Sequence, residues 1–239
     1  MADDNRPLKY MRYAIGEIVL VVIGILIALQ INTWNEERVN QKKANTYLSM
    51  LSNEIENNLR RLVMATNLAQ GHQDYNLNTL KELNSETAKY IDIDSLYKLT
   101  TTHGPHPKMA LERSVLDDLI NSGAMENVTD SLLRNEIFRI ESLLKRYDHE
   151  HHNIQLIWEE QLRPYHLEHL NESRIIGMLE SNFDTDVNAF VHNRKYANIM
   201  AGNIIFFGNY KNSIEGINKE FKLTLLHIRS YLGKKSTFE

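Results

Sequence analysis

The stretch AIGEIVLVVIGILIALQINTWNEE, residues 14–37, decides the class of protein to which this 239-residue chain is assigned. From Ile18 to Leu29 it holds twelve consecutive residues without a polar side chain. A run of twelve is also typical of a buried core helix or of the centre of a signal peptide. It begins beside Glu17, and a charged carboxylate is costly in lipid. The flanking residues are therefore needed to distinguish a transmembrane helix from a core helix or a signal peptide.

Aromatic side chains flank the apolar run at both ends. Tyr10 and Tyr13 precede it and Trp34 follows it, in the positions that amphipathic rings take at the two lipid–water boundaries. A helix from Tyr13 to Trp34 is roughly 30 Å long at about 1.5 Å per residue, which matches the hydrocarbon core of a bilayer. We therefore predict a transmembrane helix over residues 13–34.

A cleaved signal peptide is the alternative for this region. The segment after the run offers no small-x-small cleavage site, and the charged sequence that follows continues as a helix-forming sequence, so we expect the segment to be retained. Three basic residues stand on each side: Arg6, Lys9 and Arg12 before it, and Arg38, Lys42 and Lys43 after it. The leading three lie closer to the span, which favours a cytoplasmic N-terminus, residues 1–12. Residues 35–239 would then be the periplasmic domain of a bacterial inner-membrane protein.

Composition restricts the remaining classes. The whole chain is 42% hydrophobic and 24% charged, so the apolar excess is local and one membrane segment with one polar domain fits. The formal net charge of −4, without a basic cluster, argues against nucleic acid as a partner. The absence of cysteine excludes disulfides and thiolate metal sites and leaves the redox compartment undecided.

Helical periodicity continues beyond the span. Apolar residues recur at intervals of three and four, which places them on one stripe of a helix: Ala44, Leu48, Leu51, Ile55, Leu59 and Leu62. No proline occurs between Leu8 and Gly104, so we predict that the membrane helix runs directly into this one, with Gly71 as the candidate break. Residues 100–108 contain a glycine and two prolines and are predicted to form a tip or hinge loop.

Three further helices are predicted. The first covers 110–121 and is closed by Gly123 as a left-handed cap. The second begins at the capping residue Asp130 and is stopped by Pro164, and the last covers 193–232. No strand pattern persists, so the fold class is all-α, with the N-terminal transmembrane helix continuing into an antiparallel helical bundle.

Glu17 lies on a helix face that could contact a second membrane helix. On a helix, Glu17, Val21, Gly24 and Ala28 fall within about 40° of one line. The Gly24-x-x-x-Ala28 spacing allows two membrane helices to approach closely. These four residues are therefore the predicted contact face with a partner helix. The alternative is that Glu17 lies near enough to the boundary to reach the headgroups.

The histidine-rich stretch YDHEHHNIQLIWEEQLRPYHLEH, residues 147–169, is the candidate for metal chemistry. His149 and His152, like His166 and His169, stand three apart and share a helix face. The zinc-protease spacing is absent because position 153 is Asn153, and no paired carboxylate-x-x-histidine units indicate a di-iron site. We interpret the stretch as a polar helix face and expect no cofactor and no catalytic residue.

The block from Tyr13 to Asn32, with Trp34-Asn35-Glu36-Glu37 behind it, closely resembles the N-terminal signature of an uncharacterised family of bacterial single-span membrane proteins. LDDLINSGAMENVTDSLLRNEI, residues 116–137, is similar to the middle of that family. The resemblance implies an envelope protein with a helical outer domain and supplies no activity.

Together these patterns favour a non-enzymatic, membrane-anchored interaction or scaffold protein. Its expected partners are the lipid bilayer and either a second copy of the chain or other membrane or envelope proteins. Two alternatives stay open. One is an ion- or proton-conducting oligomer that uses Glu17. The other is a metal-binding sensor or enzyme that uses the histidines from His149 to His169.

Overall fold

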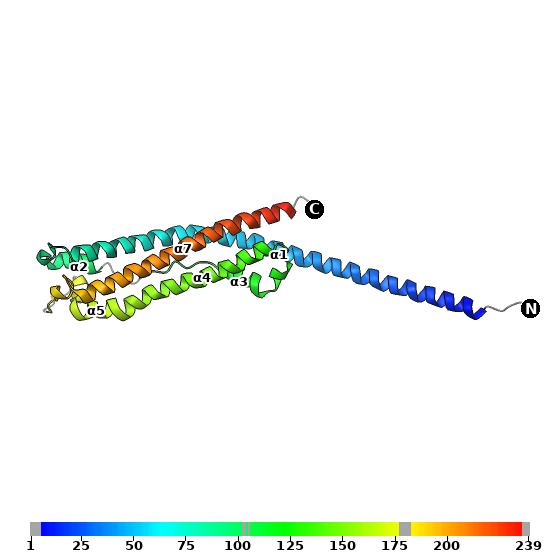
Figure 1. Ribbon diagram of the computed structural model, residues 1–239, viewed down its shortest axis with the longest axis horizontal. Helices are drawn as coiled ribbons and strands as arrows, with labels where there is room; N and C mark the ends of the chain where they lie inside the picture. The colour runs from blue at the N-terminus through cyan, green and yellow to red at the C-terminus, as the bar shows by residue number, and fades with distance from the viewer. Residues whose placement is uncertain (1–5, 102–103, 105, 177–182, 236–239) are drawn as a thin grey trace, which may run out of the picture.

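The structure, a computed structural model, describes residues 6–101, 104, 106–176 and 183–235, and this part of the chain is helical and contains no strand. Helix α1 (Arg6–Leu83) is 78 residues long and passes through Gly71 without a break. Figure 1 shows its N-terminal part projecting from the rest of the molecule. The predicted all-α class and the continuation of the apolar helix into a bundle are confirmed.

The C-terminal half of α1 packs against α7 (Arg194–Lys235), the other very long helix. Near the start of the bundled part of α1, Gln41 lies 3.4 Å from the hydroxyl of Tyr231, near the end of α7. Towards the other end, Gln73 donates to the carbonyl of Ile204, near the start of α7, at 3.3 Å. The two helices are therefore antiparallel.

Helix α4 (Ser131–Ile157) completes the bundle and is also antiparallel to α7. His227 of α7 lies 3.1 Å from Asp130, which precedes α4. Further along, the hydroxyl of Tyr210 in α7 donates to the hydroxyl of Tyr147 in α4 at 2.7 Å. Because α7 opposes both neighbours, α1 and α4 run parallel to each other.

A parallel pair of helices requires a connection that returns the chain to its starting end, and residues 106–113 provide it. This extended segment, the crossover segment, follows α2 (Ile93–Thr101) and runs back along the bundle. Asn58 of α1 bonds Glu112 twice, through the Glu112 carbonyl at 2.6 Å and its N–H at 2.7 Å. Tyr147 of α4 donates to the Met109 carbonyl at 2.7 Å.

The loop predicted at residues 100–108 is therefore only partly correct. Thr100 and Thr101 belong to α2, and residues 106–108 are the start of the crossover segment rather than a tip. Residues 102, 103 and 105 of the predicted loop lie outside the described residues, and Gly104 and Pro107 are not helical, as the sequence indicated. The path of the crossover segment is fixed by side chains of α1 and α4 that hydrogen-bond to its backbone.

The short helix α3 (Ser114–Asn121) receives its cap from another helix. The buried carboxylate of Glu54 in α1 accepts from the N–H groups of Val115 at 2.8 Å and Leu116 at 3.2 Å. A carboxylate at a helix N-terminus is favourable because it satisfies free N–H groups and meets the positive end of the helix dipole. The helix begins at Ser114, later than the predicted start at 110.

Two helix-boundary predictions are confirmed. Gly123 has a φ of 75° and separates α3 from the 3-10 turn η2 (Ala124–Asn127), where only glycine adopts the left-handed backbone at little cost. Asp130 caps α4 by accepting from the N–H groups of Leu132 at 2.9 Å and Leu133 at 3.1 Å.

Pro164 does not stop the helix, contrary to the prediction. A π-helical turn, η3 (Trp158–Leu162), follows α4 directly and leads into α5 (Arg163–His169). In an α-helix the proline ring collides with the carbonyl four residues before it. The wider π turn, in which the Arg163 N–H bonds the Trp158 carbonyl, provides the space for the ring to follow without ending the helix.

The end of the molecule opposite the N-terminus is closed by short elements between and after these helices (Figure 1). They are η1 (Ala88–Tyr90), α2, α5, α6 (Glu172–Ile176) and η4 (Val187–Ala189). We call this the distal end. The predicted last helix, 193–232, is confirmed as α7.

The buried apolar residues form two clusters. The larger, the bundle core, runs from Ala44 to Tyr231 between α1, α3, α4 and α7. The smaller, the distal core, lies at the distal end and includes Leu83, Leu162 and Tyr196. Residues 11–40 are all exposed, so the packed part of α1 begins near Ala44.

Candidate functional site

The exposed N-terminal part of α1 carries the predicted contact face. Within the described part of the chain, α1 is the one helix that is long and apolar enough to cross a membrane, and none of its apolar window is buried. A core helix of a soluble protein would be mostly covered. Glu17, Val21, Gly24 and Ala28 all lie in this bare segment, and a Cβ added at Gly24 would meet nothing within 4 Å. The face is therefore free to meet lipid or another helix.

The predicted boundary aromatics lie on the same helix. Tyr13 and Trp34 are 68% and 64% exposed, and the guanidinium of Arg38 lies 5.9 Å from the centre of the Trp34 ring. Tyr10 belongs to α1, but its side chain lies outside what the structure describes. Tryptophan and tyrosine are enriched at both lipid–water interfaces of membrane helices, so these positions fit the predicted boundaries.

The four predicted histidines fall into two separate environments. His149 and His152 are exposed on α4, whereas His166 is buried and His169 half-buried on α5. His149 and His166 are separated by roughly 25 Å of helical rise. Among the residues that the structure describes, no group of three or more His, Asp or Glu side chains is placed to hold a metal ion.

His169 and His166 instead contribute to packing at the distal end. The His169 ring lies 4.5 Å from that of Tyr165, and its Nδ1 is 3.6 Å from a carboxylate oxygen of Asp186. The His166 ring lies 6.0 Å from those of Phe190 and Tyr196. An aromatic layer of this kind stabilises the distal core.

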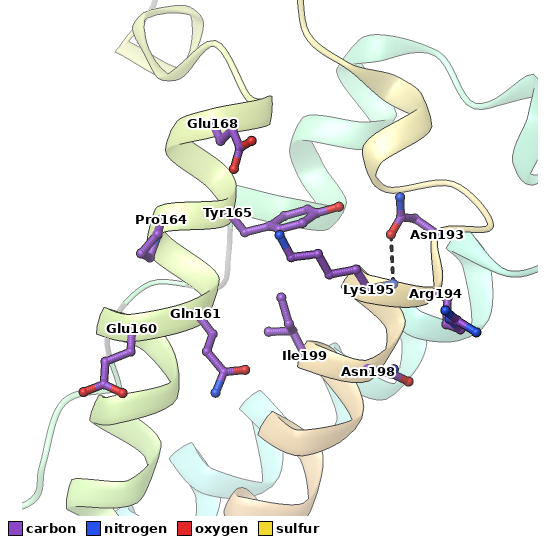
Figure 2. A pocket seen from close by; sticks show the side chains of 10 residues that line it. All are labelled: Glu160, Gln161, Pro164, Tyr165, Glu168, Asn193, Arg194, Lys195, Asn198 and Ile199. Atoms are coloured by element: carbon purple, nitrogen blue, oxygen red, sulfur yellow. Dashed lines mark hydrogen bonds between the residues drawn. The ribbon is translucent and has the colours of Figure 1, made fainter.

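An open cleft of about 750 Å³ lies beside this aromatic layer, between η3–α5 and the first turns of α7 (Figure 2). We call it the distal cleft. It is lined by Glu160, Gln161, Pro164, Tyr165, Glu168, Asn193, Arg194, Lys195, Asn198 and Ile199. Local structure places both walls: the π turn and Pro164 shape one, and Asn193 begins the other by accepting from the N–H groups of Lys195 at 3.0 Å and Tyr196 at 3.2 Å.

Charge is divided between the two walls of the distal cleft. Glu160 and Glu168 stand on the η3–α5 wall, and Arg194 and Lys195 on the α7 wall. The Lys195 ammonium lies 5.1 Å from the centre of the Tyr165 ring across the cleft. A ligand or protein segment that carries both charges would find a partner on each side.

Tyr165 forms the floor between the walls. Its hydroxyl donates to the Ala189 carbonyl at 2.6 Å. Burial raises the pKa of Tyr165, and the nearby carboxylates of Asp186 and Glu168 raise it further. The phenol therefore stays neutral, and the arrangement suits binding through ion pairs, hydrogen bonds and stacking rather than proton transfer at neutral pH.

A buried histidine and tyrosine cluster was not predicted. His106 of the crossover segment lies between His72 of α1, at 4.8 Å between ring centres, and His151 of α4, at 5.7 Å. Tyr210 of α7 is 5.6 Å from both His106 and His151. His151 Nε2 lies 3.1 Å from the His106 carbonyl.

Burial dominates the electrostatics of this cluster. Burial, helped by the neighbouring His72 and His151, lowers the pKa of His106 to about 4. The pKa values of His72 and His151 are also lowered, again chiefly by burial. The cluster draws its members from four segments far apart in sequence, so no local spacing could have revealed it. The one available signal was His106 between two prolines, where a helix cannot form.

The chain matches the model of a "Family of unknown function (DUF6090)" over residues 17–175. The match covers more than half of the sequence. The chain belongs to this family. The DUF6090 match includes Gly24 and Ala28, the crossover segment, α4 and α5, and it ends before α7, which supplies one of the three long helices of the bundle here. No curated protein and no solved structure matches the chain.

Proposed function

We propose that this protein is a single-span membrane-anchored interaction protein whose helical bundle holds the distal cleft away from the bilayer. The supporting observation is the unbroken helix α1. Its N-terminal part is the exposed apolar segment, and its C-terminal part is one of the three long helices of the bundle. From Trp34 to Leu83 the helix rises roughly 70 Å. A helix without a hinge transmits position and orientation, which is the property of a scaffold rather than of a flexible tether.

The proposed location is a bacterial inner membrane, with residues 1–12 cytoplasmic and the bundle periplasmic. The lysines and arginines nearest the leading end of the span support this orientation. A reporter fused after Glu239 tests it. We expect periplasmic reporter activity, while cytoplasmic activity would overturn both the orientation and a role in the envelope.

We further propose that the membrane helix self-associates through the face formed by Glu17, Val21, Gly24 and Ala28. Nothing in the described chain approaches Gly24, so a second helix has room to come close at the small residues. Glu17 in such a contact can hydrogen-bond across the interface or meet water, and either is cheaper than exposure to lipid.

The self-association proposal is tested by the mass of the full chain in mild detergent. We expect Gly24→Leu to shift the protein towards monomer because the larger side chain separates the helices, whereas Glu17→Gln keeps the shape and leaves the mass nearly unchanged. Gly16→Leu is the matched control, since Gly16 is equally open but about 100° away from Glu17 around the helix. A monomeric wild type, or normal assembly of Gly24→Leu, would contradict the proposed contact face. Contact of Glu17 with the lipid headgroups would then be the better explanation.

A further inference from the structure

A small polar cavity lies where the bundle core meets the distal core. It offers about 10 Å³ of free space, which is the room that one water molecule requires. Its walls come from α1, the crossover segment, α4, η3 and α7. They include Ile154 and Phe207 of the bundle core and Leu162 of the distal core. The cavity therefore adjoins the π turn on the inside of the protein.

Three buried polar side chains line this cavity, and each has one atom without a hydrogen-bond partner. The atoms are Asn76 Nδ2 of α1, His106 Nδ1 of the crossover segment and Asn203 Oδ1 of α7. The three residues are between 1% and 5% exposed. Each unsatisfied buried group costs about 1–3 kcal/mol, and native proteins rarely leave several together.

The donor and acceptor pattern matches the bonding capacity of a single water. Asn76 Nδ2 is a donor and Asn203 Oδ1 is an acceptor. Burial lowers the pKa of His106 to about 4, so at neutral pH the ring is uncharged and its Nδ1 can accept. A water molecule would receive one hydrogen bond from Asn76 and donate one each to Asn203 and His106. Three bonds are the usual number for a buried water.

A metal cation fits this cavity less well. The described lining contains no carboxylate, and Asn203 supplies the one unpartnered oxygen in it. An alkali or divalent ion prefers several oxygen ligands. A protein that leaves the cavity dry would keep three polar atoms unpaired in one place.

We propose that one internal water molecule occupies this cavity and joins the crossover segment to α1 and α7. The site lies at the junction of the two cores, beside His106 at the start of the crossover segment. The water thus fixes the start of the crossover segment, the element that makes α1 and α4 parallel.

The first test is a double-mutant cycle on the full chain in detergent, with denaturant unfolding as the measurement. If a water bridges the two residues, Asn76→Leu and Asn203→Leu should each lower the folding equilibrium constant at least tenfold, because each removes a partner of the water. The double variant should lose less than the product of the two, because the water is already lost in either single variant. Additive effects would overturn the proposal, since the two side chains would then act separately.

Thr224→Val is the matched control. Thr224 Oγ1 is also buried and unpartnered, but Thr224 does not line the cavity. Removing a polar atom that has no partner should leave folding unchanged or improve it. If the asparagine variants behave in the same way as Thr224→Val, the cavity is dry and the proposal fails.

A crystal structure of the full chain gives an independent result that does not depend on how well leucine fits. A solvent peak within about 3.2 Å of the three atoms supports the proposal. Clear density for the three side chains with no peak between them overturns it, and so does a peak coordinated at metal distances.

Discussion

At the scale of single residues, burial rather than spacing distinguishes the histidines of this protein. His149 and His152 share a helix face but stand in solvent, whereas His106 is enclosed between α1, α4 and α7. A buried imidazole resists protonation because the surrounding protein solvates the charge poorly. The titration of His106 is therefore linked to folding.

Acid should destabilise the protein through His106. Its folded pKa of about 4 lies below the unfolded value of 6.5, so the unfolded chain takes up the proton first as the pH falls. The contribution of His106 to stability is full above about pH 6.5 and is lost towards pH 4, with a slope of up to about 1.4 kcal/mol per pH unit for one proton. Denaturant unfolding between pH 7 and pH 4 measures the slope.

We expect His106→Gln to reduce this slope and His149→Gln, at an exposed position of α4, to leave it unchanged. The slope should not vanish, because His72 and His151 also have lowered pKa values. Identical slopes for wild type and His106→Gln would contradict a buried, neutral imidazole at this position.

At the scale of elements, the continuity of α1 and the π turn of η3 shape the molecule. Gly71 is tolerated in mid-helix although glycine weakens helices, because the bonds of the surrounding turns and the packing on either side hold the backbone. At η3 the widened turn lets Pro164 sit inside a nearly continuous helical stretch. That turn directs Trp158 and Leu162 to the inner cavity, while Glu160 and Gln161 line the distal cleft.

Gly71→Ala should stabilise the protein by about 0.5–1 kcal/mol, because alanine favours helix and loses less chain entropy on folding. A Cβ at Gly71 meets nothing within 4 Å. Gly202→Ala is the control in α7, where the new Cβ would lie 3.1 Å from Ile157 Cδ1. We expect this crowding to remove the gain. Equal shifts in the unfolding midpoint for the two variants would show that helix propensity alone determines their change in stability.

At the scale of the whole molecule, the bare segment and the packed bundle share one helix but no core. The packed part of α1 begins near Ala44, and residues 11–40 contribute no buried side chain. The bundle therefore has a hydrophobic interior to which the N-terminal segment contributes nothing, and the N-terminal segment is a continuous exposed apolar stretch.

Deleting residues 1–35 should give a soluble, helical fragment that unfolds cooperatively, because the deletion removes no core residue. Circular dichroism and size-exclusion chromatography without detergent measure this. The matched control is deletion of residues 1–58, which removes the buried Ala44, Leu48, Leu51, Ile55 and Asn58 and should abolish folding. An unfolded or aggregated 36–239 fragment would mean that the bundle depends on the membrane segment.

Local sequence signals determined the elements of this protein. The apolar run, the stripe from Ala44 to Leu62, the left-handed Gly123 and the cap at Asp130 act within one or two turns, so their effects can be read from neighbouring residues. The predicted contact face at Glu17 and Gly24 also rests on helical periodicity alone.

Only the tertiary structure decided how these elements meet. The crossover segment has no regular pattern of its own, and its path is set by Asn58 and Tyr147, which are distant in sequence from Met109 and Glu112. Pro164 carries a strong stop signal that a single π turn overrides. The cavity of Asn76, His106 and Asn203 exists only where α1, the crossover segment, α4, η3 and α7 converge. Such features depend on contacts between residues far apart in the chain, and periodicity carries no information about them.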